Sequence, residues 1–133
     1  MTQRLPFVYF GPSPLGGRGV FTLQEIPKGA LIEVCPVIVL SETDKSLIHK
    51  THLHDYYFLW GKEERECVIA LGFGSLYNHL YTPNAEYVID EEQQCIDIYS
   101  IRDIKAGEEI TLNYNGDPMD RTRVWFDKGV EGD

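Results

Sequence analysis

Three short segments of this chain carry side chains whose types and spacing could do chemistry. Residues 74–87 read GSLYNHLYTPNAEY and set Asn78 beside His79, between two apolar runs. Polar residues in such a place form either a solvated turn or a site. A histidine there could be the base of a nucleophile relay, although no nucleophile-elbow motif is present. Taken alone, His79 is more simply interpreted as a hydrogen-bonded structural residue.

A second segment, PLGGRGVF at residues 14–21, is rich in glycine. A phosphate-binding loop would need Lys-Ser or Lys-Thr after its last glycine and then a helix, whereas VFT follows here and predicts a strand. The dinucleotide-binding pattern also fails, because Gly17-Arg18-Gly19 lacks the third glycine. What remains is a tight bend of the backbone, which either a ligand or another strand could approach closely.

Three histidines cluster in HKTHLHD, and Asp55 follows them. On a helix His49 and His52 would share one face, but His54 would lie elsewhere. A metal site would need a consistent spacing of three or four residues and a distant ligand as well. We therefore interpret this cluster as the exposed polar end of a helix and expect no metal.

Tyr114 ends the third segment, EITLNY, directly before Asn115 and Gly116. A tyrosine at a strand end, with its ring half buried and its hydroxyl directed outward, is well suited to line a pocket. A core tyrosine with a hydrogen-bonded hydroxyl is the alternative, and the position alone leaves both open.

The elements that must position these residues are mostly strands. The 133 residues suffice for one domain with a single core, and 12 glycines and 7 prolines predict many turns. Eight tyrosines, six phenylalanines and two tryptophans favour strands, so the predicted fold is mainly β with one or two short helices. Strand-like runs occur at residues 7–10, 19–23, 30–40 (broken by Pro36), 56–60, 67–71, 85–89, 95–100, where alternation is strict, and 109–114.

The sequence also predicts one helix and contains one pair of similar segments. Only residues 41–55 suggest a helix, which Ser41 and Asp44 would open as a capping box. The segments EIPKGALIEV (25–34) and DIKAGEEITL (103–112) resemble each other. In each, a glycine free to take positive φ would turn the chain into a strand.

Charge and cysteine content narrow the function classes. A net charge of −9 argues against direct binding of nucleic acid, which needs a basic face. It favours lysine-rich protein partners through steering, or it merely keeps the protein soluble. Cys35, Cys67 and Cys95 form no CxxC pair, so we expect reduced thiols, no structural zinc and an intracellular location, cytoplasmic or nuclear. No run has membrane-spanning length, so no membrane partner is expected.

The order of the three segments along the sequence is typical of one protein family. GRGVF, NHxxxPN and GEEITLNY follow one another between Gly17 and Tyr114, and in this order the chain closely resembles the SET-domain protein lysine methyltransferases. The resemblance covers residues 7–126. It implies a fold of short, curved β-sheets around a C-terminal pseudoknot, in which the Asn-His segment and the tyrosine-bearing segment pass through one another.

The same resemblance implies a domain organisation. Residues 1–133 would be a single SET domain, with its core at about 7–116 and a short pocket-closing tail at 117–133. The cysteine-rich flanks that bind zinc in many eukaryotic members are absent, so the chain is similar to minimal viral and bacterial members. Some minimal members dimerise, and a homodimer is compatible with the resemblance.

The roles implied for individual residues follow from their matching positions. Tyr114 would be the catalytic residue, and a channel for the substrate lysine would be lined by Tyr57, Tyr87 and Leu112. The resemblance implies S-adenosylmethionine as the cofactor, S-adenosylhomocysteine as its product, and no metal. Seven residues would bind the cofactor through backbone contacts, the Asn78 side chain or an aromatic lid: Gly17, Arg18, Gly19, Asn78, His79, Trp125 and Phe126.

The implied reaction is an in-line displacement in which a neutral lysine amine attacks the methyl group of a sulfonium. Since a lysine of pKa about 10.4 is neutral in only ~0.04% of molecules at pH 7, the site must favour the neutral amine. The positive sulfonium beside the amine would do so, and Tyr114 would orient the amine. An alkaline pH optimum is expected.

Two departures from the family pattern bear on activity. Many members carry Ser-Cys after Asn-His, where this chain has Leu80-Tyr81, which changes the local packing. Many also carry Phe or Tyr two residues before the catalytic tyrosine, where this chain has Leu112. A channel of Tyr87 and Tyr114 suits lower methylation states, but Leu112 leaves more space.

The expected partner is a lysine-containing basic protein. Histones and DNA-binding proteins fit the acidic charge, and so do ribosomal or other lysine-rich targets. The alternative function is a catalytically silent SET domain that binds a cofactor or a peptide as an interaction module. Retention of Tyr114 together with Asn78, His79 and Trp125 favours the enzyme.

Overall fold

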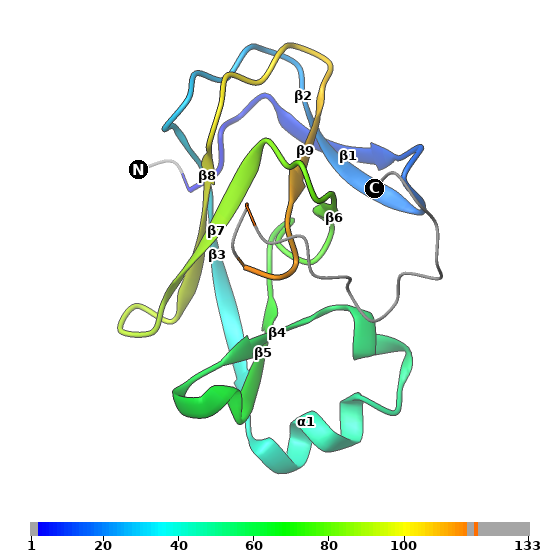
Figure 1. Cartoon of the computed structure of the whole chain (residues 1–133), viewed down its shortest axis with the longest axis vertical. Helices are drawn as coiled ribbons and strands as arrows, with labels where there is room; N and C mark the ends of the chain where they lie inside the picture. The colour runs from blue at the N-terminus through cyan, green and yellow to red at the C-terminus, as the bar shows by residue number, and fades with distance from the viewer. Residues whose placement is uncertain (1–2, 117–118, 120–133) are drawn as a thin grey trace.

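The computed structural model describes residues 3–116 and 119, which fold mainly into two curved β-sheets (Figure 1). One sheet has the strand order β1-β2-β9-β6 and the other has the order β4-β5-β3-β8-β7. The prediction of a mainly β fold is confirmed. The strands are β1 (Val8–Pro12), β2 (Arg18–Thr22), β3 (Leu31–Leu40), β4 (Tyr57–Trp60), β5 (Glu66–Ala70), β6 (Asn78–His79), β7 (Ala85–Asp90), β8 (Cys95–Ser100) and β9 (Glu109–Leu112).

Strand β3 continues through Pro36, where the sequence predicted a break. It pairs with β8 up to Pro36, opposite Cys95, and with β5 from Val37 onward. The Pro36 carbonyl accepts a hydrogen bond from the N–H of Leu71 at 2.8 Å, so the missing N–H faces the side where the β5 ladder has not yet begun. The proline therefore removes no ladder bond, and the prediction of a break was wrong.

The predicted helical stretch divides into two pieces. Helix α1 (Glu42–Ile48) begins after Ser41, whose hydroxyl accepts a hydrogen bond from the Asp44 N–H at 3.1 Å, the first of the two bonds of the predicted capping box. The 3-10 turn η1 (His52–Asp55) begins anew after Thr51, whose side chain accepts from the Leu53 N–H. A second 3-10 turn, η2 (Lys62–Glu64), joins β4 to β5.

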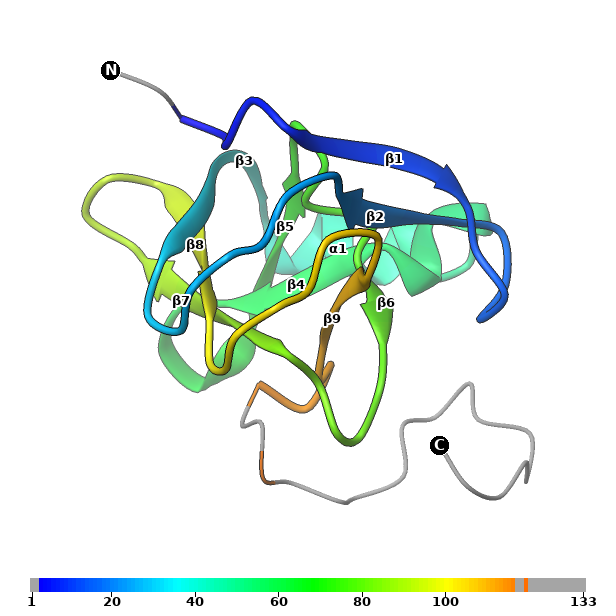
Figure 2. The same cartoon turned by 90° about the horizontal axis from the view of Figure 1, so that it is seen from above.

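The two similar segments, residues 25–34 and 103–112, lie against each other in the fold. Ile26 and Ile104 exchange a pair of backbone hydrogen bonds, each 2.8 Å long. Gly29 and Gly107 have φ angles of +85° and +86°, so both glycines take the predicted positive φ. The paired turns feed β3 and β9, one strand in each sheet, and so connect the two sheets at one end of the molecule (Figure 2).

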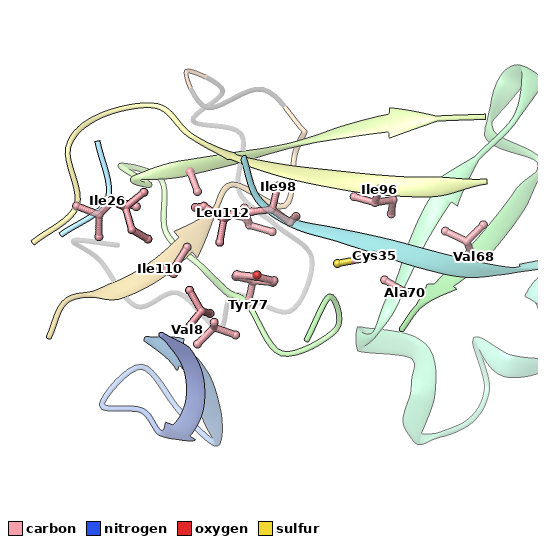
Figure 3. Close-up of a cluster of buried hydrophobic side chains, with 14 of the residues drawn as sticks. Val8, Ile26, Cys35, Val68, Ala70, Tyr77, Ile96, Ile98, Ile110 and Leu112 are labelled. Atoms are coloured by element: carbon pink, nitrogen blue, oxygen red, sulfur yellow. The ribbon is translucent and has the colours of Figure 1, made fainter. Parts of the chain in front are cut away.

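The hydrophobic core lies between the sheets and receives residues from both (Figure 3). Ile96 and Ile98 on β8 are fully buried while Asp97 and Tyr99 are half buried, which confirms the alternation read from the sequence. Cys35, Cys67 and Cys95 are all buried and reduced. The core also contains Val20, Ile26, Ile32, Val68, Tyr77, Ala85, Ile104, Ile110 and Leu112.

Candidate active site

The three motif segments are brought together in one sheet. Strand β9, from the third motif, lies between β2, from the first, and β6, from the second (Figure 1). It pairs antiparallel with β2, with Val20 opposite Ile110, and parallel with β6, with Asn78 opposite Thr111. Segments that are about 90 and 30 residues apart in the sequence thus become adjacent strands, which positions their polar residues side by side.

We call the place where β2, β9 and β6 meet the junction. On its β2 side, the Asn78 side chain is held by two acceptors. Its amide nitrogen donates to the Arg18 carbonyl at 3.1 Å and to the Glu109 carboxylate at 2.8 Å. The other carboxylate oxygen of Glu109 accepts from the hydroxyl of Ser13 at 2.7 Å. A Cβ added to Gly19 would lie 2.2 Å from this carboxylate, so glycine at this position leaves room for the hydrogen-bonded Glu109 and Asn78 side chains.

The glycine-rich segment forms the turn between β1 and β2. The Gly17 carbonyl accepts a hydrogen bond from the Ser13 N–H at 3.0 Å, and Gly16 and Gly17 have φ angles of +125° and +56°. A Cβ added to Gly17 would meet no heavy atom within 4 Å, so its surroundings are open. The predicted bend is confirmed, and the close approach at Gly19 is that of the Glu109 and Asn78 side chains.

His79 anchors the backbone of Tyr114. Its Nδ1 accepts a hydrogen bond from the Tyr114 N–H at 3.0 Å, which places the proton of the neutral ring on Nε2. The ring packs edge-on against Tyr81, with ring centroids 4.3 Å apart. This arrangement supports the structural interpretation of His79, and it shows that the unusual Tyr81 supplies packing for the histidine.

Tyr114 follows β9 and reaches back to the Asn-His segment. Its hydroxyl donates to the backbone carbonyl of Tyr77, the residue before Asn78. Burial raises the pKa of the Tyr114 hydroxyl well above its usual value, and the Tyr56 hydroxyl and the Asp55 carboxylate add to this effect. Tyr114 is therefore a neutral phenol at physiological pH.

A cavity of about 530 Å³ opens beside Tyr114. Its walls come from β4 and β7, the two edge strands of the five-stranded sheet, because the sheet curls until its edges face each other. Tyr57, Tyr87 and Tyr114 all line it, and the Phe58 and Tyr87 rings meet edge-on with centroids 5.0 Å apart. The Tyr87 hydroxyl donates to the Tyr114 carbonyl at 3.4 Å, and burial raises the pKa of Tyr87 to about 12.

The structure does not place every proposed site residue at this cavity. Leu112 is fully buried in the core and is absent from the cavity wall, so its side chain packs inward from β9. Leu112 is part of the core because the five-stranded sheet packs against this face of β9, a contact that its position in the sequence did not reveal. Trp125 and Phe126, the expected aromatic lid, lie outside the described residues.

The histidine cluster lies at the rim of the cavity. His49 Nδ1 is 2.9 Å from the Tyr57 hydroxyl, and His54 Nε2 is 3.3 Å from a carboxylate oxygen of Asp55. His49 and His54 line the cavity, whereas His52 packs near Tyr56. The interpretation of these residues as a polar helix end missed their contact with a candidate channel residue.

Among the described residues, one other group has metal-ligand chemistry: Asp90, Cys95 and Asp97, whose ligand atoms lie within 4.8 Å of one another. Burial, together with the Asp97 carboxylate, raises the pKa of the Cys95 thiol to about 11. With no cation bound, Cys95 is therefore a neutral thiol at physiological pH.

Two further residues of the junction, Asn84 and Glu109, lie within the motifs read from the sequence but were given no role there. Asn84 is buried, and its side chain donates to the Glu109 carbonyl at 2.8 Å and accepts from the Thr111 N–H at 2.8 Å, so it fixes the edge of β9. Glu109 holds Asn78 and Ser13. Its signal was available, because an acidic residue in an otherwise apolar strand needs a partner.

Three comparisons agree with this geometry. Residues 17–115 match the SET domain family. The chain is 35% identical over 112 residues to a Schizosaccharomyces pombe protein named histone-lysine N-methyltransferase, H3 lysine-37 specific; the match covers 84% of this chain and 71% of the relative. A crystal structure of a Plasmodium falciparum protein described as a candidate histone methyltransferase superposes with a TM-score of 0.68 at 29% identity, covering 86% of this chain and 95% of the other.

The fold and the arrangement of its motifs are those of a SET domain, and the chain belongs to the SET domain family. Within that family its enzyme class is protein-lysine N-methyltransferase.

Proposed function

We propose that this protein transfers a methyl group from S-adenosylmethionine to a lysine side chain of a basic protein, with Tyr114 as the catalytic residue. One observation carries the proposal: the Tyr114 hydroxyl, fixed by the Tyr77 carbonyl, lies between the Asn-His strand and a cavity of about 530 Å³ lined by tyrosines. A cavity of this kind can admit the aliphatic stem of a lysine and present its amine to the hydroxyl.

The cofactor would bind at the junction, beside the backbone of β2 and β6. Strand β6 is an edge strand of its sheet, where a backbone can offer hydrogen bonds to an adenine. The open surroundings of Gly17 admit a ligand beside the backbone of Arg18. Because the Asn78 amide nitrogen is held by the protein, its oxygen is the atom that would accept from the ammonium of the cofactor. These groups fit S-adenosylmethionine, which supplies an electrophilic methyl on a positive sulfonium.

Tyr114 would orient the lysine amine through its oxygen. Because the hydroxyl proton is given to Tyr77, the oxygen is left to accept a hydrogen bond from the amine. The amine would lose its extra proton to solvent before transfer, and the new nitrogen–carbon bond would form as the carbon–sulfur bond of the cofactor breaks. The rate enhancement then comes chiefly from alignment of the amine lone pair with the methyl group.

The substrate class follows from charge. The net charge is −9, and Asp55 and Glu64 line the cavity beside its tyrosines. Carboxylates at the entrance favour a lysine flanked by basic residues. The S. pombe relative is named for activity on histone H3. For this chain we propose a histone or another basic protein.

We further propose that the chain acts as a single SET domain inside the cell. Its three cysteines are buried thiols, which suits a reducing compartment. None of the helices in the described ranges 3–116 and 119 is long and apolar enough to cross a membrane.

The experiment that tests the cofactor assignment is calorimetric titration with S-adenosylmethionine. Wild-type protein should bind, and Asn78→Ala should bind at least about tenfold more weakly, because it loses the side chain that links Arg18 and Glu109. Tyr87→Phe, which changes the lysine side of the site, is the matched control and should bind normally. Equal affinity in all three proteins would contradict the assignment.

A further inference from the structure

A buried carboxylate lies against the segment that joins β5 to β6. Glu33, on β3, is only 2% exposed and belongs to none of the three motifs. Its Oε1 accepts a hydrogen bond from the Tyr77 hydroxyl at 2.6 Å, and its Oε2 accepts from the Phe73 N–H at 2.9 Å. One carboxylate thus binds both ends of residues 73–77.

The surroundings of Glu33 are built to hold this charge. Arg4 approaches Oε2 at 3.2 Å, and its guanidinium stacks on the Phe73 ring at 3.7 Å from the centroid. A Cβ added to Gly72 would lie 2.4 Å from Oε2, so the chain passes the carboxylate as closely as a glycine allows. Burying a carboxylate is costly unless several donors satisfy it, and here three do.

The held segment is the one that fixes Tyr114. The Tyr77 carbonyl accepts the hydrogen bond of the Tyr114 hydroxyl, while the Tyr77 ring is buried in the core, with its hydroxyl at the far end of the side chain (Figure 3). Gly74 and Ser75, within the same segment, line the cavity. Residues 71–77 lie outside any strand, so no sheet ladder sets the position of this carbonyl.

We propose that Glu33 is a positioning residue for methyl transfer: by holding the Tyr77 hydroxyl and the Phe73 amide, it places the Tyr77 carbonyl and so orients the Tyr114 hydroxyl toward the lysine. The inference rests on the proposed function of Tyr114. It assigns a role in catalysis to a side chain outside the cavity wall, and it accounts for a charged residue in the interior of β3.

Two substitutions test the hydrogen bonds that connect Glu33 to Tyr114 through Tyr77. Tyr77→Phe deletes the hydroxyl and keeps the carbonyl. Glu33→Gln keeps the side-chain shape, but one of the two oxygens that face Tyr77 and Phe73 becomes an NH2 group, which cannot accept a hydrogen bond. Ser100→Ala is the matched control: it removes a buried hydroxyl that donates to the Pro27 carbonyl at 2.6 Å, in the turn before β3.

The first readout does not depend on turnover. A fluorotyrosine placed at position 114 reports its surroundings by fluorine NMR. The Tyr114 signal should shift or broaden in Tyr77→Phe and in Glu33→Gln and should stay unchanged in Ser100→Ala. An unchanged signal in both of the first two variants would overturn the positioning role, whatever the activity of the protein.

The second readout is steady-state kinetics of methyl transfer. Tyr77→Phe and Glu33→Gln should each lower kcat about tenfold, the loss expected when an aligned group is misplaced, with KM for S-adenosylmethionine within about twofold of wild type. In a Tyr114→Phe background, Tyr77→Phe should lower kcat no further, because the hydroxyl it orients is gone. Additive losses, or unchanged kcat in both single variants of an active enzyme, would overturn the inference.

The two readouts keep this inference distinct from the proposed function. If the wild-type protein transfers no methyl group but the fluorine signal responds to Glu33→Gln, the proposed function fails and the contact from Glu33 to Tyr114 stands as a structural one without a catalytic role. If the wild type is active and neither substitution changes the fluorine signal, the proposed methyl-transfer function stands and the positioning role of Glu33 fails.

Discussion

At the scale of single residues, hydrogen bonds fix the positions of the protons in the site. His79 Nδ1 accepts the Tyr114 N–H, and the Tyr114 hydroxyl donates to the Tyr77 carbonyl, so each group has one orientation. Neither His79 nor Tyr114 is arranged as a strong base. The chemistry therefore depends on an amine that reaches the site already neutral, and on groups that hold it in line.

This dependence predicts a rise of rate with pH. Below the pKa of lysine, the neutral fraction grows about tenfold per pH unit, so turnover limited by chemistry should increase steeply from pH 7 toward pH 9 before it levels. Tyr87 has its pKa raised to about 12, and the pKa of Tyr114 is also raised, so neither phenol ionises in this window. The measurement is kcat for a peptide substrate between pH 6 and 9.

A flat profile over this range, with chemistry shown to limit the rate by single-turnover measurement, would contradict the mechanism. The same raised pKa values set the upper limit of the assay. Unfolded tyrosines ionise near pH 10 while the buried ones do not, so the folded state is favoured below that pH and loses stability as pH rises toward 12.

The number of methyl groups transferred is also a residue-scale property. Tyr87 lies 3.4 Å from the Tyr114 carbonyl and narrows the cavity with Phe58. Tyr87→Phe removes a hydroxyl and makes room for a larger methylated amine, so the product should shift toward higher methylation states. Mass spectrometry of the product measures this. Leu112→Val, a change inside the core, should leave the distribution unaltered, and an equal shift in both variants would contradict a role specific to Tyr87.

At the scale of elements, the site depends on β2 and β6 meeting across β9. The close packing at Gly19 is the sharpest requirement, because an added Cβ would lie 2.2 Å from Glu109. A larger residue at position 19 would displace the Glu109 carboxylate and disturb its hydrogen bonds to Ser13 and Asn78.

Gly19→Ala should therefore destabilise the protein by about 1–3 kcal/mol, the usual cost of overpacking, and weaken cofactor binding. Gly11→Ala is a matched control, since Gly11 is the partner of Gly19 in the β1–β2 pair and its added Cβ would meet only Tyr9 at 3.9 Å. Thermal unfolding and calorimetry measure both effects. Equal stability of the two variants would show that the approach of β9 is not tight.

The elements also show which parts of the fold could be predicted from sequence. Runs such as 95–100 were recognisable because alternation of buried and exposed residues is a local property. The two-residue strand β6 was not, because Asn78 and His79 are polar and become a strand only by pairing with β9. Pro36 was misread for the same reason: whether a missing N–H matters depends on which neighbour lies beside it.

The candidate site divides in the same way. Tyr114 and Asn78 were found from the order of motifs, and their neighbours Tyr87 and Tyr57 do line one cavity with Tyr114. Glu33 could not be found, because its role depends on contacts with residues 40 and 44 positions away. No local pattern records such a contact.

At the scale of the whole molecule, charge is the property that selects partners. The net charge of −9 and the carboxylates of Asp55 and Glu64 at the cavity favour basic peptides. Raising the salt concentration from 0.05 to 0.5 M should raise KM for a basic peptide several-fold while kcat stays nearly constant, because screening weakens attraction between exposed charges.

A charge substitution at the cavity isolates this effect from general screening. Asp55→Asn combined with Glu64→Gln should raise KM at low salt and flatten its salt dependence. Glu25→Gln, which removes an exposed carboxylate between β2 and β3, should change neither. If the control variant behaved like the double variant, total charge and not the cavity would be responsible.

The measurement that tests the central claim most directly is methyl transfer from labelled S-adenosylmethionine to a mixture of lysine-rich proteins, with products identified by mass spectrometry. Wild-type protein should yield methyl-lysine, and Tyr114→Phe should reduce the yield at least about 100-fold, because the group that orients the amine is lost. Unchanged transfer by Tyr114→Phe would contradict the assigned role of the tyrosine. Absence of transfer by a wild type that still binds the cofactor would identify a silent binding module instead.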